Sequence, residues 1–206
     1  EYTVTASGVT LHTHVGIAAI CVQKFLDLDV TWTVANNGSV GLALHAKRNT
    51  VFPELPRFGL RLFLPQEMSQ VNYYGMGPME CYRDKHHAAS HSSYTATVWQ
   101  LHEDYIRPQE NGSHFDCDYV MLAGDAVRLT AVGTQPFSFN ASHYTQEELT
   151  RKAHNYELEP CGSTVLCLDY AQNGIGSESC GPRLLEQYRL DDPTFNFGLR
   201  LFPEKK

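Results

Sequence analysis

The chain has 206 residues, of which 42% are hydrophobic and 19% charged, and this composition excludes a disordered or fibrous protein. Its 23 acidic residues against 16 Lys and Arg give a formal charge of −7, and no dense basic run offers a nucleic-acid surface. No apolar stretch approaches the roughly 18–20 residues of a membrane-spanning helix, and the first ten residues lack the basic and apolar regions of a signal peptide. We therefore expect one domain over residues 1–206, with neither nucleic acid nor a membrane as a partner.

Seven short segments alternate apolar and polar residues or run apolar, and they predict strands. They are rich in Val, Leu, Phe, Tyr and Thr, and Gly, Pro and Asn bound them. The segments are 30–34, 59–64, 94–98, 126–132, 137–139, 165–170 and 195–202. Many short strands without long helical patterns between them predict an all-β fold, an antiparallel sandwich.

One short helix is predicted near 145–155. Thr145 fits the N-cap position and Glu148 follows three residues later, which is the pattern of a capping box. The helical pattern runs to about His154–Asn155 and places Leu149 and Ala153 on one side. The helix is a short insertion between strands.

The segment Tyr105–Gly112 is the densest run of directional polar side chains in the sequence. Arg107, Gln109 and Glu110 carry the paired donors and acceptors that bind sugar hydroxyls, so they are candidate substrate-binding residues. The alternative is a turn built on Pro and Asn-Gly, in which Arg107 and Glu110 tie down their own loop. Both interpretations stay open at this point.

Six cysteines and ten histidines are the candidate metal ligands. The cysteines form no Cys-x-x-Cys pair, and no Cys/His cluster has the spacing of a zinc site. His86 and His87 are adjacent and would point to opposite faces of any strand, so they are poor partners for one metal. We expect no metal or cofactor in this chain. Free, mostly buried thiols would suit a reducing compartment, which favours the cytoplasm and leaves the periplasm and secretion open.

Five motifs occur in order along the chain. They are Leu55–Leu60, Tyr74–Asp84, Tyr105–Gly112, Phe137–Tyr144 and Asp169–Pro182. Together they resemble the C-terminal small-chain domain of the large β-galactosidases of glycoside hydrolase family 2, over roughly Leu55 to Phe202 and more weakly back to Val30. The resemblance implies a large antiparallel β-supersandwich similar to galactose mutarotases. It also places Glu1 inside the family's terminal domain, so that the first strands would be missing here.

The same resemblance implies how the chain would function. The catalytic acid/base and nucleophile Glu residues of such enzymes lie in a (β/α)8 barrel that this chain lacks, as do the metal ligands. We therefore expect the chain alone to be inactive, and to work with the barrel, with a β-galactoside and within an oligomer of the parent enzyme. Whether it is a fragment or a separate small subunit stays open.

The loop after Asp169 would be this domain's contribution to the sugar site. Relatives carry a Trp there that stacks on the sugar, and the matching position in this sequence is Cys180. The resemblance thus implies Glu178, Ser179 and Cys180 as substrate-side residues. A thiol supplies no aromatic face, which indicates a different substrate preference or a compensating aromatic residue. A catalytic role for Cys180 is not expected, because the sequence shows no neighbouring base that would activate its thiol.

Two other functions compete with this interpretation. A free-standing sugar-binding module would use Arg107, Gln109 and Glu110 together with the 11% of aromatic residues. An aldose epimerase would share the implied fold, but it needs an acid and a base flanking the anomeric carbon. The sequence does not place such a pair, and fold alone does not carry function.

Overall fold

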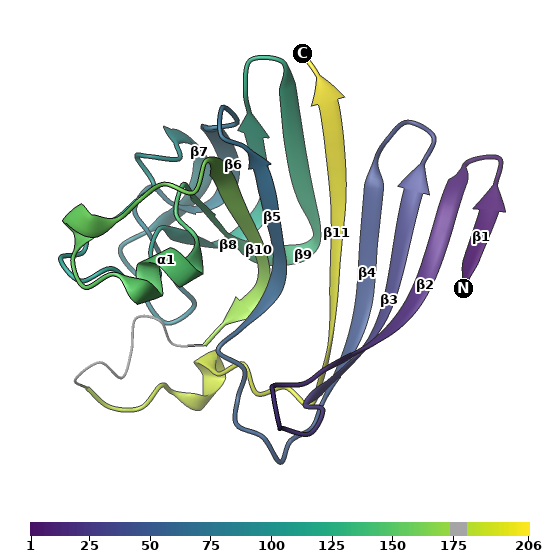
Figure 1. Ribbon diagram of the computed structural model, residues 1–206, viewed down its shortest axis with the longest axis horizontal. Helices are drawn as coiled ribbons and strands as arrows, with labels where there is room; N and C mark the ends of the chain where they lie inside the picture. The colour runs from purple at the N-terminus through teal and green to yellow at the C-terminus, as the bar shows by residue number, and fades with distance from the viewer. Residues whose placement is uncertain (174–180) are drawn as a thin grey trace.

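The computed structural model describes residues 1–173 and 181–206, and within them eleven strands pair in antiparallel fashion into one curved, continuous sheet (Figure 1). The strands are β1 (Tyr2–Thr5), β2 (Gly8–Ile17), β3 (Leu26–Ala35), β4 (Val40–Arg48), β5 (Arg57–Pro65), β6 (Gln70–Gly77), β7 (Ser90–Thr97), β8 (Ser113–Ala123), β9 (Val127–Ser142), β10 (Ser163–Gln172) and β11 (Thr194–Lys205). The helices are α1 (Gln146–Arg151) and the 3₁₀ turns η1 (Asn155–Glu157) and η2 (Glu186–Tyr188). The predicted all-β class is confirmed. Within the described ranges, no helix has the length and apolar character needed to cross a membrane.

The sheet runs in the order β1-β2-β3-β4-β11-β9-β8-β6-β7, and β10 adds a branch by pairing with both β9 and β5. The C-terminal strand β11 therefore lies between β4 and β9 and joins the N-terminal strands to the rest of the sheet (Figure 1). Strand β9 is the branch point, since it pairs with β8, β10 and β11.

Strand β9 contains two segments that were predicted as separate strands, 126–132 and 137–139. The prediction of two strands was therefore wrong here. Its first half pairs with β11 and its second half with β10. Between the two halves, four residues of β9 lie opposite a single residue of β8, a large bulge. Pro136, which has no N–H to donate, lies in this bulge. At Gly133 an added Cβ would lie 2.1 Å from the Gln135 carbonyl oxygen, so only glycine fits the bend.

Five strands, β1, β2, β4, β6 and β8, lie outside the seven segments predicted as strands. Strands β1 and β2 bury almost nothing, so neither face requires apolar residues. Strand β8 is interrupted near Asp116, whose φ of 55° is left-handed and whose neighbours shift register against β9. Such a bulge breaks the period of two on which strand prediction depends.

The predicted helix exists but is shorter than expected. The Thr145 hydroxyl accepts a hydrogen bond from the Glu148 amide at 3.1 Å, which confirms the N-cap. The Glu148 carboxylate binds Arg151 and Lys152. The chain leaves the helix at Lys152, which has extended dihedral angles. Ala153 therefore lies beyond the helix and is exposed, so the predicted extent of the helix to about 154–155 was wrong.

A cluster of aromatic rings fills the core between β6, β8 and β9. The Tyr73 and Phe139 ring centroids are 4.9 Å apart, and the His114 ring stacks on Phe139 at 5.1 Å. All three side chains are fully buried. The sequence gives no indication that one of the ten histidines is a core residue.

Candidate functional site

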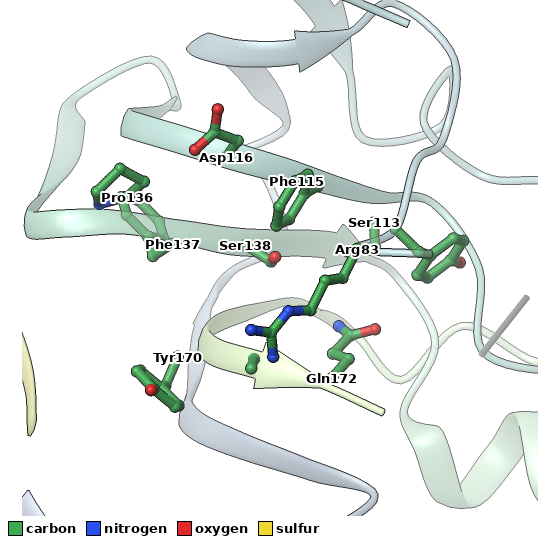
Figure 2. A pocket seen from close by; sticks show the side chains of 11 residues that line it. Arg83, Ser113, Phe115, Asp116, Pro136, Phe137, Ser138, Tyr170 and Gln172 are labelled. Carbon is green, nitrogen blue, oxygen red and sulfur yellow. The ribbon is translucent and has the colours of Figure 1, made fainter. Parts of the chain in front are cut away.

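A pocket of about 240 Å³ lies where β10 ends, and Figure 2 shows its lining. Four segments build it: the turn after β6, the start of β8, the bulged part of β9, and the last residues of β10. The lining residues are Tyr82, Arg83, Ser113, Phe115, Asp116, Pro136, Phe137, Ser138, Tyr170, Ala171 and Gln172. Two bulges, one in β8 and one in β9, therefore shape two of its walls.

Arg83 supplies the positive charge of the pocket. It lies in a tight turn that Tyr82 and Lys85 close with two backbone hydrogen bonds of 2.9 Å. Its guanidinium extends between Tyr170 and Gln172 (Figure 2). One of its nitrogens donates to the Arg189 carbonyl at 3.4 Å, and no carboxylate of the described residues is within ion-pair distance of it. Most of its hydrogen-bonding capacity is therefore available to a ligand.

A chain of buried polar contacts fixes Gln172 in the wall. The Arg57 guanidinium donates two hydrogen bonds to Asp169, at 2.9 and 2.7 Å, and a third to Glu110 at 2.8 Å. The Gln172 amide nitrogen donates to the same Asp169 carboxylate at 3.0 Å. Burial alone would lower the pKa of Arg57, but the hydrogen bonds and charge of Asp169, together with Glu110, raise it, so the guanidinium is always charged.

Two buried polar atoms of the pocket wall have no hydrogen-bond partner among the described residues. They are the Ser113 hydroxyl and the Gln172 side-chain oxygen, on residues that are 1% and 5% exposed. Buried polar groups nearly always have a partner, and leaving one without a partner costs about 1–3 kcal/mol. Both atoms have almost no accessible surface, so a ligand in the pocket would reach them only if the wall rearranged.

The loop 105–112 is tied to the sheet through Glu80. This carboxylate accepts hydrogen bonds from the Tyr105 hydroxyl, from the Gly112 amide at 3.0 Å and from Lys85 at 3.1 Å. Burial by itself would raise the pKa of Glu80, but these hydrogen bonds hold it below its usual value, so the side chain is ionised. The loop conformation thus depends on a charge provided from outside the loop.

The predicted sugar-binding residues of this loop do not come together. Arg107 and Gln109 are exposed, whereas Glu110 is turned onto Arg57. Burial raises the pKa of Glu110, and the Arg57 charge opposes that rise. Of the three, Glu110 alone is linked to the pocket, through Arg57 and Asp169. Their role in binding sugar stays a prediction.

The second predicted set, Glu178, Ser179 and Cys180, lies outside the described residues. The pocket instead uses Arg83, Ser113 and Gln172, which the sequence analysis did not select. Arg83 and Gln172 do fall inside two of the five family motifs. No local pattern marks these three residues, because they come from a turn and two separate strands and meet only in the fold.

His86 and His87 differ from expectation. They lie in a turn before β7, and their ring centroids are 4.9 Å apart, so the two rings pack together instead of facing apart. No group of three or more metal-binding side chains occurs in the part of the chain that the structure describes. Of the five described cysteines all are free: three are buried, and Cys21 and Cys161 are exposed.

The arrangement of strands is that of the galactose epimerases. The chain is similar to the galactose 1-epimerase of Lactobacillus acidophilus NCFM, with a TM-score of 0.54 over the whole chain and 65% of that structure. At 10% identity, this likeness shows the fold alone. The predicted galactose mutarotase-like β-sandwich is confirmed.

The sequence matches the model of the β-galactosidase small chain over residues 1–201, and the protein belongs to this family. It is 46% identical to a β-galactosidase of Actinobacillus pleuropneumoniae over 92% of the chain, and 42% identical to one of Staphylococcus xylosus over 84%. The chain spans 18% and 17% of the lengths of these relatives.

Proposed function

We propose that the chain is the non-catalytic C-terminal domain of a retaining β-galactosidase of glycoside hydrolase family 2, which hydrolyses terminal β-D-galactosides. The family match over residues 1–201 carries this proposal, together with relatives of which the chain forms less than a fifth. The acid/base and nucleophile Glu residues, and any metal, belong to a barrel outside this chain. The domain contributes the loop after Asp169 to the edge of the sugar site and an interface to the barrel.

Several features of the described residues favour a non-catalytic role for this domain. The carboxylates best placed by the fold, Glu80, Glu110 and Asp169, are engaged by Tyr, Lys and Arg side chains within this domain. Retaining glycosidases need two carboxyl groups about 5–5.5 Å apart with open access to substrate. The free thiols suit the cytoplasm, as the sequence predicts.

A complementation experiment tests the proposal. The barrel-containing remainder of the enzyme is expressed without this domain, and hydrolysis of an aryl β-galactoside is measured before and after adding the purified chain. We expect neither part to be active alone and the mixture to hydrolyse the substrate. Hydrolysis by the isolated chain at an enzyme-like rate, with contamination excluded, would contradict the proposal.

A Cys180→Trp variant tests the proposed position of the loop. If residue 180 faces the sugar, an added aromatic ring stabilises the complex by about 0.5–1.5 kcal/mol, which lowers KM by about 2–10-fold in the complemented enzyme. Cys161→Trp, at an exposed position, is the matched control and should leave KM unchanged. Equal KM values for the Cys180→Trp enzyme and the parent would remove residue 180 from the sugar site.

The pocket bears on the competing functions. An aldose epimerase needs an acid and a base beside the anomeric carbon, typically His and Glu. The pocket at the end of β10 is lined by neither His nor Glu among the described residues.

A further inference from the structure

We infer that Asn37, in the turn between β3 and β4, is a site of spontaneous modification, at which the backbone nitrogen of Gly38 displaces the side-chain amide and Ser39 assists. The inference does not depend on the proposed function, since it concerns the chemistry of one hairpin turn. The same residue pair, Asn-Gly, also occurs at Asn111–Gly112, and the fold protects it there. One dipeptide thus has two different fates within the same chain.

The reaction is an intramolecular acyl transfer followed by hydrolysis. The Gly38 nitrogen attacks the Asn37 side-chain carbon Cγ, the N–Cγ bond forms and the Cγ–Nδ2 bond breaks. Nδ2 leaves as ammonia, together with the proton that the Gly38 amide gives up, and a cyclic imide remains. Water then adds to either carbonyl of the imide and opens the ring, so that residue 37 becomes Asp or isoaspartate. Water is the co-reactant, and one amide becomes one carboxylate.

The turn between β3 and β4 leaves both reacting groups open to water. The Gly38 amide donates to the Ala35 carbonyl at 2.9 Å, and Gly38 has a left-handed φ of 83°. A turn that is followed by a left-handed residue is a common hairpin connection. Residues 36–38 are all exposed, and a Cβ added at Gly38 would meet no other part of the described chain within 4 Å. No described side chain therefore shields the attacking nitrogen.

Ser39 activates the carbonyl group that is attacked. Its backbone amide donates to Asn37 Oδ1 at 3.0 Å, and its hydroxyl donates to the same oxygen at 2.7 Å. A backbone amide can only donate, so the Asn37 atom that faces Ser39 is the oxygen and not Nδ2. Negative charge develops on Oδ1 when Cγ becomes tetrahedral, and two donors aimed at this oxygen stabilise that charge. Ser39 therefore lowers the barrier to ring closure.

At the second Asn-Gly pair the side-chain amide is buried and fixed on both of its polar atoms. Asn111 is 5% exposed. Its Oδ1 accepts from the Glu103 amide at 3.0 Å, and its Nδ2 donates to the Gln109 carbonyl at 2.9 Å. Loss of Nδ2 as ammonia would leave the Gln109 carbonyl without this donor, and burial keeps water from the carbonyl carbon. The leaving group at Asn111 is therefore retained by the fold.

The attacking nitrogen at this second pair is blocked as well. The Gly112 amide donates to the Glu80 carboxylate at 3.0 Å, and the adjacent negative charge disfavours loss of the amide proton. A Cβ added at Gly112 would collide with the Leu101 carbonyl oxygen, so the backbone is closely packed here. Attack by Gly112 first requires a charge-assisted hydrogen bond to open. Attack by Gly38 requires only that an exposed turn opens locally, which costs little free energy.

Peptide mapping by mass spectrometry tests the inference on the full 206-residue chain, incubated at mildly alkaline pH. We expect Asn37 to convert to Asp and isoaspartate about 10–150-fold faster than Asn111, the factor that one hydrogen bond to a charged group represents. In strong urea, which removes the fold, Asn37 and Asn111 should convert at similar rates. No conversion at Asn37, or equal rates at the two residues in the folded chain, would overturn the inference. The third Asn-Gly pair, at 173–174, extends beyond the described residues, and its peptide is quantified separately.

Asn36 is an internal control for the role of Gly38. It lies in the same exposed turn, but the residue that follows it is Asn37, whose side chain hinders attack by its own nitrogen. Asn36 should therefore convert more slowly than Asn37. Equal rates at the two residues would mean that exposure alone sets the rate, and would refute the role assigned to Gly38.

A Ser39→Ala variant tests the assistance from the hydroxyl. The substitution removes one of the two donors to Asn37 Oδ1 and keeps the backbone amide, so conversion of Asn37 should slow by about 2–10-fold. Ser92→Ala, at an exposed position on β7, is the matched control and should convert Asn37 as the parent does. An unchanged rate in the Ser39→Ala variant would refute the role of its hydroxyl.

Discussion

Replacing Arg57 with Met is expected to destabilise the fold by about 3–5 kcal/mol, because it leaves a buried charge without its partner. The Asp169 side chain is 2% exposed, and Arg57 provides two of its hydrogen bonds. Glu110 would lose its ion pair in the same substitution. Removing one member of a buried ion pair costs more than the pair contributes, since the remaining carboxylate must be desolvated or protonated.

The control for this variant is Arg61→Met, on the same strand. Arg61 pairs with Glu147 at 3.0 Å, but their side chains are 39% and 68% exposed. An exposed pair of this kind contributes about 0–1 kcal/mol because water screens it. Urea denaturation of both variants should therefore separate them by several kcal/mol. Equal effects would mean that Asp169 finds other partners, and that the buried network does not hold Gln172 in place.

The Arg57 contacts also show which parts of the structure the sequence could predict. Alternation along one segment is a local signal, and it located β3, β5, β7, β10 and β11. The ion pair between Arg57 and Asp169 joins residues 112 positions apart, and no local pattern marks it. The five motifs identified the family without knowledge of this ion pair, because a resemblance between whole segments does not depend on knowing which residues are in contact.

The pocket was not predictable for a related reason. Its shape depends on two bulges, and a bulge appears in a sequence only as an interruption of the strand period. Asp116 has a left-handed backbone although it is neither Gly nor part of an Asn-Gly pair, the residues that usually mark this conformation. Its backbone conformation was therefore not predictable from the sequence. Ser113 and Gln172 look like ordinary strand residues until the fold shows that their polar atoms have no partner among the described residues.

The second large expected effect is a loss of stability at acidic pH, which we attribute to His114. Burial lowers the pKa of His114 to about 4, from a usual value of 6.5, while the Met76 carbonyl opposes that shift. The ring nitrogen Nδ1 lies 3.0 Å from the Tyr73 hydroxyl and 3.2 Å from the Met76 carbonyl, so this side of the ring is hydrogen-bonded within the core. The other nitrogen, Nε2, is buried without a partner among the described residues. A second proton would therefore have no acceptor, and the folded protein keeps His114 neutral.

The sign of the pH dependence follows from this. Between pH 6.5 and about 4, the unfolded chain binds a proton at His114 that the folded protein does not bind. The free energy of unfolding therefore falls as the pH is lowered through this window, by up to about 1.4 kcal/mol per pH unit and about 3 kcal/mol in all. Burial also lowers the pKa of His102, which acts in the same direction, whereas the raised pKa of Glu110 opposes both at the acidic end.

A His114→Gln variant isolates the contribution of this one residue. Gln can donate to the Met76 carbonyl and accept from the Tyr73 hydroxyl but does not titrate, so the variant removes the proton uptake and keeps polar partners for both groups. Urea denaturation is measured from pH 8 down to pH 4.5. At pH 8 the two proteins differ only by the cost of the altered packing against Phe139, which serves as the internal control. On acidification the parent should lose about 2–3 kcal/mol more than the variant. Parallel stability curves would show that protonation of His114 does not limit stability, and that the acid sensitivity of the fold comes from other groups.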